Sequence, residues 1–212
     1  MYNVMTKTFS LPAADEKEIW RYAGCKGGDE ALTTLLKECL LESETAISPR
    51  ACYCKLSLAD FCAFVDGAAQ SKSVEQRLQG CGEVIIFAAS VGLGLDRLME
   101  KYAKVSPTKA LLLQAIGAER IEALCEQVCA HFQIEYGEIT TRFSAGYGDF
   151  PLSAQKDFFR LLDCPKKIGV SLTDALLMIP TKSVTAFVGI GKAKGAAGCL
   201  ACEKEECNFR KE

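Results

Sequence analysis

The sequence predicts an α+β fold, and three observations support this prediction. Residues 118–132 have the apolar spacing of an amphipathic helix, and residues 51–58 alternate with the period of two of a strand. Helical and strand patterns are mixed without regular alternation of one strand and one helix, which favours α+β over a parallel α/β sheet. The chain has 212 residues, of which 49% are hydrophobic, so it can form one large domain with its own core.

The first half of the chain is predicted to hold three strands and three helices. In order, these are an edge strand within residues 1–10, helices over 15–23 and 29–45, a strand over 51–58, a short helix over 73–79 and a buried strand over 83–89. Asp29 is well placed to cap its helix, because a short side-chain oxygen can accept a hydrogen bond from a free N–H in the first turn. The alternation in residues 51–58 predicts that only one face of that strand is buried.

The second half is predicted to begin with helices and to end with strands. The helices cover residues 95–102, a segment that starts at Pro107, residues 118–132 and residues 153–162, and the strands cover 168–172, 176–179 and 183–190. Pro107 suits the first turn of a helix, where its missing N–H is not needed. Ser153 is a candidate N-cap, and residues 180–182 are predicted to form the turn between the last two strands.

Residues 142–151, which read RFSAGYGDFP, are predicted to form a shaped loop. Two glycines and a proline prevent a regular helix or a central strand. Glycine lets the backbone approach a ligand closely, and the fork of donors on Arg142 can bind both oxygens of a carboxylate or phosphate. The alternative is an ordinary surface loop with a solvated arginine.

A second segment, residues 171–185, strengthens the ligand-binding interpretation. It reads SLTDALLMIPTKSVT. Together with the loop, this segment resembles the S-adenosylmethionine-binding reactivation domain of cobalamin-dependent methionine synthase. Arg142, Gly146 and Tyr147 match the family's Arg-x-x-x-Gly-Tyr loop. The later pattern, Leu-Thr-(Asp/Glu)-x-x-x-Met-x-Pro-x-x-Ser-Val, is matched by Leu172, Thr173, Asp174, Met178, Pro180, Ser183 and Val184. The resemblance covers residues 115–190, is weaker over the first hundred residues and does not extend to the Cys-rich tail.

The resemblance implies a fold and a ligand site. The fold would be a central twisted antiparallel sheet flanked by helices. Arg142 would bind the carboxylate of S-adenosylmethionine, and the backbone of Ala145, Gly146 and Tyr147 would lie against the adenosine. In the family, an acidic residue on the preceding long helix also faces the ligand. Glu122 best matches that position and Glu119 is the other candidate, whereas the alternative for both is a solvent-facing helix acid.

The resemblance also implies a function in which the chain supports reductive methylation of cobalamin. The corrin-binding signature Asp-x-His-x-x-Gly is missing around His131, the single histidine. The cobalamin is therefore expected on a separate methionine synthase core or another corrinoid protein, with an electron donor such as flavodoxin or ferredoxin. If the chain is active, it is a methyltransferase component, and the alternative is a non-catalytic S-adenosylmethionine-binding module.

The C-terminal residues 191–212 are predicted to be a Gly-rich tether and a Cys-rich tail attached to a domain of residues 1–190. Cys199, Cys202 and Cys207 have a spacing that suits zinc or an iron–sulfur cluster. The fourth ligand could come from Cys164, from Cys52 or Cys54, or from a second molecule. One alternative is a thiol-rich terminus without a metal. Another is that the whole chain is a metal or iron–sulfur redox accessory protein for a corrinoid enzyme.

Composition argues against several other classes of protein. The net charge is −2 and no basic patch with interleaved aromatics occurs, so nucleic acid is not an expected partner. Apolar runs fall short of the roughly 20 residues that cross a bilayer, and the N-terminus lacks the pattern of a secretory signal. A cytoplasmic location is therefore expected. The 12 cysteines are expected to be reduced rather than paired in disulfides.

Overall fold

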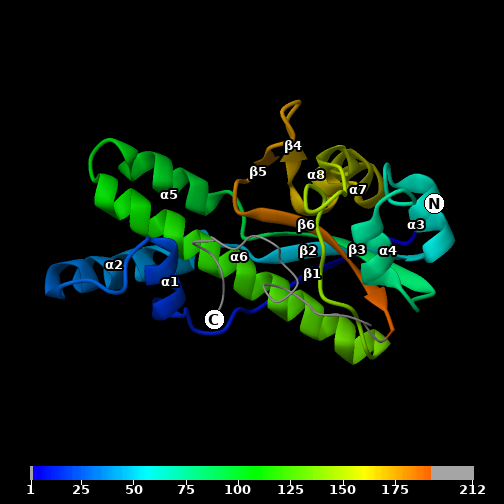
Figure 1. Cartoon of the computed structure of the whole chain (residues 1–212). Helices are drawn as coiled ribbons and strands as arrows, with labels where there is room; N and C mark the ends of the chain where they lie inside the picture. The colour runs from blue at the N-terminus through cyan, green and yellow to red at the C-terminus, as the bar shows by residue number, and fades with distance from the viewer. Residues whose placement is uncertain (1, 192–212) are drawn as a thin grey trace.

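The computed structural model describes residues 2–191 and contains a four-stranded antiparallel sheet between two layers of helices (Figure 1). Its strands are β1 (Met5–Thr8), β2 (Arg50–Ser57), β3 (Glu83–Ser90) and β6 (Ser183–Ile190), in the order β1-β2-β3-β6. The predicted α+β class is confirmed, and so is the antiparallel sheet flanked by helices.

One face of the sheet is covered by the long helix α6 and its neighbours. These helices are α1 (Glu16–Tyr22), α2 (Glu30–Ala46), α5 (Gly94–Ala103) and α6 (Pro107–Tyr136). Their apolar side chains meet Ile85 and Phe87 of β3 in what we call the α6 core. Asp29 caps α2 as predicted, since its carboxylate accepts from the Leu32 N–H at 2.8 Å.

Shorter helices cover the other face. These are α3 (Leu58–Phe64), α4 (Lys72–Leu78), the 3₁₀ turn η1 (Leu152–Ala154), α7 (Gln155–Leu162) and α8 (Cys164–Ile168). They enclose a second cluster, the α7 core, in which Phe61, Phe158 and Phe187 are fully buried. None of the helices in the described part of the chain has both the length and the apolar composition that a membrane span requires.

Strand β2 is buried on both faces over most of its length, so the predicted burial of a single face is wrong. Cys52 and Cys54 face the α7 core, whereas Tyr53 faces the α6 core and is only 4% exposed. A hydrogen bond of 3.0 Å joins the Tyr53 hydroxyl to Nε2 of His131 on α6, which makes this burial tolerable. The alternation in the sequence is therefore real, but it separates two cores rather than core from solvent.

Helix α6 is continuous, whereas the sequence suggested two helices that meet near Gly117. A Cβ at Gly117 would lie 2.5 Å from Cδ2 of Leu95 and 2.8 Å from Cε of Lys182. The glycine therefore gives α5 and the chain before β6 room to pack closely against α6. Its cost to the helix, about 1 kcal/mol, is offset by that packing.

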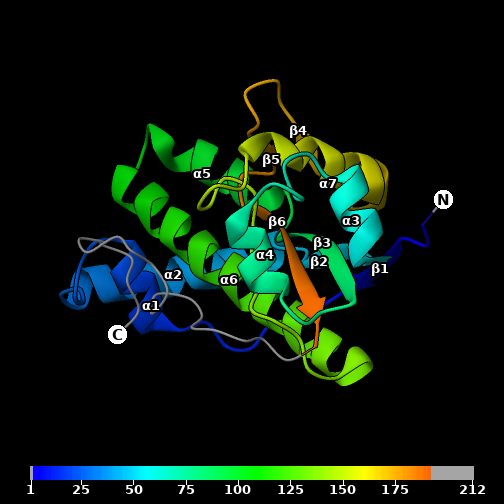
Figure 2. The ribbon, with the colours of Figure 1, turned by 45° about the vertical axis from the view of Figure 1, so that its right-hand side comes forward.

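Residues 153–179 differ from the elements predicted for them. The predicted strands 168–172 and 176–179 shrink to β4 (Ser171–Leu172) and β5 (Met178–Ile179), which form a separate hairpin that projects from the body (Figure 2). The helix predicted from 153 begins with η1, and Ser153 does not cap it. Its hydroxyl instead donates to Oδ2 of Asp66 at 3.0 Å.

A polar contact holds α2, α5 and α6 together. The Glu42 carboxylate accepts from Nζ of Lys101 at 3.1 Å, from the Tyr102 hydroxyl at 2.9 Å and from Nζ of Lys109 at 3.0 Å. Burial alone would raise the pKa of Glu42, but these hydrogen bonds outweigh burial and lower the pKa from 4.5 to about 2. The carboxylate is therefore ionised and paired at neutral pH.

We expect Glu42→Gln to lower the free energy of unfolding by about 1 kcal/mol at pH 7, since the site is partly screened by solvent. The folded pKa lies below the ordinary value, so the stabilisation is complete above pH 4.5 and is lost as the pH falls towards 2. Urea unfolding of both proteins at pH 7 and pH 3 measures the difference. A difference that grows on acidification would contradict this assignment.

Candidate functional site

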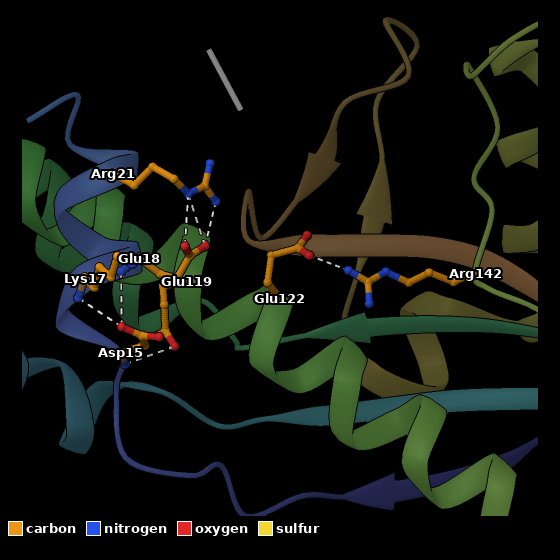
Figure 3. A network of polar contacts seen from close by, with 7 residues as sticks. All are labelled: Asp15, Lys17, Glu18, Arg21, Glu119, Glu122 and Arg142. Atoms are coloured by element: carbon orange, nitrogen blue, oxygen red, sulfur yellow. Dashed lines mark hydrogen bonds and ion pairs between the residues drawn. The ribbon is translucent and has the colours of Figure 1, made fainter. Parts of the chain in front are cut away.

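The predicted loop lies along the outer edge of β6, and we call residues 142–150 the Arg142 loop. The N–H and C=O groups of Phe143 both pair with Phe187 of β6, each at 2.9 Å. Phe143 joins the α7 core, and because neighbouring side chains alternate, Arg142 turns to the opposite side. Arg142 there reaches across to α6 (Figure 3).

Arg142 forms an ion pair with Glu122 of α6. The two side chains are 28% and 34% exposed, so the ion pair is partly desolvated and still in contact with solvent. Burial opposes the charge on Arg142, but the neighbouring Cys125 and Glu122 outweigh burial and raise the pKa of Arg142. The structure thus brings one lasting positive charge and one acid together from two separate elements.

Glu119, the other acidic candidate, has a different environment. It is 6% exposed and binds Arg120 through both oxygens, at 2.5 and 2.6 Å. Arg120 also donates to the carbonyl oxygens of Pro12 at 2.7 Å and Ala13 at 3.3 Å, and Glu119 accepts from the Asp15 N–H at 3.3 Å. Glu119 thus points toward the N-terminal segment, and Glu122 points toward Arg142 (Figure 3).

Helix α1 contributes a neighbour that no local sequence pattern predicted. Burial and, after it, the charge of Glu122 raise the pKa of Tyr22, so this phenol lies within electrostatic range of Glu122. Arg21 stacks on the Tyr22 ring at 4.3 Å and forms an ion pair with Glu18 at 2.7 Å. These residues are about a hundred positions from Glu122, so only the tertiary fold reveals their proximity.

The other three loop candidates lie just beyond Arg142. Ala145 is 4% exposed, whereas the Tyr147 ring is 66% exposed. Gly146 lies between them with φ of +91°, and its N–H donates to the Phe150 carbonyl at 2.9 Å. This conformation strains any residue with a Cβ, so glycine is required for the turn that exposes Tyr147.

The edge of β6 beside this turn has free backbone groups. Phe187 uses its N–H and C=O on the Arg142 loop, and groups two residues apart on a strand point the same way, so those of Thr185 face the same edge. In residues 2–191, neither these groups nor the buried Thr185 hydroxyl has a hydrogen-bond partner. Buried polar groups are rarely left unpaired, so this position favours a bound polar molecule.

The predicted tail ligands Cys199, Cys202 and Cys207 lie outside the described residues. Cys52, Cys54 and Cys164 are fully buried in the α7 core. Burial raises the pKa of Cys54 to about 12, and contact with the Cys52 thiol, followed by burial, raises the pKa of Cys164. Over residues 2–191, no group of three histidine, cysteine or acidic side chains is arranged to hold a metal ion.

An open hollow of about 660 Å³ lies elsewhere, at the start of α2 beside Asp29 and Thr34. It contains none of the predicted site residues. The convergence of charges at Arg142, and not this hollow, identifies the candidate site.

Two of three comparisons with known proteins found a match. The sequence profile described as "Vitamin B12 dependent methionine synthase, activation domain" matches residues 48–207. The solved structure titled "Crystal Structure of the MetH Reactivation Domain bound to AdoHcy" superposes with a TM-score of 0.67 and 15% identity, covering 92% of this chain and 81% of that chain. At this identity, the superposition shows a shared fold. No curated protein sequence matches the chain.

Proposed function

Because the chain belongs to the activation domain family of vitamin B12-dependent methionine synthase, we propose that it binds S-adenosylmethionine beside Arg142. In this role it supports reductive methylation of cobalamin carried by a partner protein. The solved relative of the same fold is bound to AdoHcy, the molecule that remains when S-adenosylmethionine has given up its methyl group.

The Arg142–Glu122 ion pair is the observation that carries this proposal. The amino-acid end of S-adenosylmethionine bears a carboxylate and an ammonium on one carbon. The carboxylate can take the place of Glu122 on the guanidinium, and the ammonium can pair with the freed Glu122 carboxylate. Both charges of the amino-acid end, together with Arg142 and Glu122, then have opposite partners in this partly desolvated position.

The adenosine end has polar partners along the same edge. The backbone of residues 145–147 and the free N–H and C=O of Thr185 offer donors and acceptors to a purine or a ribose. Gly146, in the middle of this stretch, has no side chain of its own to occupy the space. A ligand that spans Arg142 and this edge would satisfy the unpaired groups of Thr185.

Transfer of a methyl group from a sulfonium requires a strong nucleophile and an in-line approach, and it needs no general base. Cobalamin on the partner supplies that nucleophile when it is reduced to the cobalt(I) state. This chain's contribution is to hold the sulfonium with its methyl group toward the partner, which is catalysis by positioning. The exposed Tyr147 ring lies on the loop that would flank the methyl group.

A single-turnover assay tests the proposed function. A partner with bound cob(II)alamin is mixed with an electron donor and methyl-labelled S-adenosylmethionine, with and without this chain. We expect the label to reach the cobalt, with one equivalent of S-adenosylhomocysteine formed, only when the chain is present. Labelling at the same rate without the chain would contradict the proposal, as would no labelling with any cobalamin-bearing partner of the methionine synthase class.

A further inference from the structure

The far end of the Arg142 loop is fixed to α4 by Asp149. Its carboxylate accepts from the Ser71 hydroxyl at 2.6 Å, from the Lys72 N–H at 2.8 Å and from the Ser73 N–H at 3.0 Å. These donors lie more than seventy residues earlier in the chain. The contact therefore fixes the loop to a separate element and does not merely shape it from within.

The contact depends on a charged acceptor. Hydrogen bonds from Ser71 and Ser73, followed by that from Lys72, lower the pKa of Asp149, so the carboxylate stays ionised at neutral and mildly acidic pH. Backbone N–H groups in the first turn of a helix have no partner within the helix, and a carboxylate satisfies them well. Asp149 therefore acts on α4 much as a capping residue does, but from the Arg142 loop.

Two more contacts show how closely the loop follows α4. Gly148 has φ of +57°, and a Cβ there would lie 2.3 Å from Oγ of Ser73. At the other end of the loop, the Arg77 guanidinium of α4 stacks over the Phe143 ring at 4.8 Å and donates to the Thr141 hydroxyl. Helix α4 thus holds the loop at both ends and leaves residues 145–147 between the two attachments.

We propose that Asp149 is a positioning residue for the ligand site. By fixing the Arg142 loop to α4, its carboxylate holds the backbone of residues 145–147 in the conformation that receives the ligand. This inference rests on the proposed function, because the ligand is taken to be S-adenosylmethionine. It adds a residue that touches neither the ligand nor the reacting atoms.

The substitution Asp149→Asn removes the charge with almost no change in shape. One carboxylate oxygen becomes an amide nitrogen, a donor that would face the donors of α4. The Arg142 loop should then leave its position against α4 more often. Ligand binding must reorder the loop, and the free energy that this requires weakens the affinity. We expect the dissociation constant for S-adenosylmethionine to rise about tenfold, which corresponds to the loss of one charged hydrogen bond.

Hydrogen exchange and calorimetry together test this inference. In the free protein, Asp149→Asn should speed amide exchange in residues 144–150 and leave β3 and β6 as they are in the wild type. Gly148→Ala should do the same by steric means, with the charge intact. Asp29→Asn is the matched control, because Asp29 accepts one backbone N–H at 2.8 Å in α2 and does not touch the loop. The control should change neither loop exchange nor affinity.

The outcomes separate this inference from the function on which it rests. Wild-type loop exchange in both variants would overturn the role of Asp149, and so would faster loop exchange with unchanged affinity. If the wild type itself fails to bind S-adenosylmethionine, the proposed function falls and the ligand role of Asp149 falls with it. The exchange data would then still show whether Asp149 holds the loop.

Discussion

Arg142→Ala is expected to weaken binding of S-adenosylmethionine by about 1.5–3 kcal/mol, or about 10- to 150-fold. The substitution removes the cation that pairs with the ligand carboxylate. It also leaves Glu122, which is 34% exposed, without the opposite charge that it has in the free protein. Calorimetric titration of the two proteins measures the change directly.

Arg160→Ala is the matched control for this experiment. Arg160 is 67% exposed, pairs with Asp157 at 2.9 Å and lies on α7, away from α6. Arg160→Ala removes the same charge and the same side-chain atoms as Arg142→Ala, but at a more exposed position. Its affinity should equal that of the wild type, and an Arg142→Ala protein with unchanged affinity would show that Arg142 does not bind the ligand.

Glu119→Ala is expected to have the largest effect on stability, about 3–5 kcal/mol. Arg120 is 5% exposed and, within residues 2–191, would keep only the carbonyl oxygens of Pro12 and Ala13 as partners for its charge. The segment that leads into α1 would also lose its contact with α6 at Asp15. Urea unfolding at pH 7 measures the loss.

Glu122→Gln, three residues further along α6, provides the contrast. Its ion pair is partly exposed, so the free energy of unfolding should fall by about 1 kcal/mol or less, whereas affinity for S-adenosylmethionine should fall clearly. The two acids would thus have separate roles, one in stability and one in binding. A stability loss at Glu119 no larger than that at Glu122 would contradict this division.

The family resemblance ranked Glu122 ahead of Glu119, but helix periodicity alone could not separate the two acids. Residues three apart on a helix lie on nearly the same side, so periodicity leaves Glu119 and Glu122 equivalent. The choice depends on two segments far away in the chain, the Arg142 loop and residues 12–15. Their positions relative to α6 follow from packing, which a local pattern does not encode.

Local chemistry predicted other features well. Asp29 acts as the expected cap, and the glycines mark the turn in the Arg142 loop. The errors arose where tertiary contacts override a local preference. Tyr53 is buried because His131 satisfies its hydroxyl, and Gly117 sits inside a helix because neighbouring elements pack against it. No sequence pattern indicated the proposed role of Asp149, because the groups that donate hydrogen bonds to its carboxylate lie at residues 71–73, more than seventy positions earlier in the chain.

The central claim is that Arg142 recognises the carboxylate of S-adenosylmethionine. The most direct measurement is the coupling energy between the Arg142 guanidinium and the ligand carboxylate. It comes from four calorimetric titrations, in which the wild type and Arg142→Ala each bind S-adenosylmethionine and decarboxylated S-adenosylmethionine. We expect the wild type to prefer the intact ligand by about tenfold or more, and the variant to bind both forms equally. The account would be contradicted if the wild type bound both forms equally, or if the variant kept the full preference.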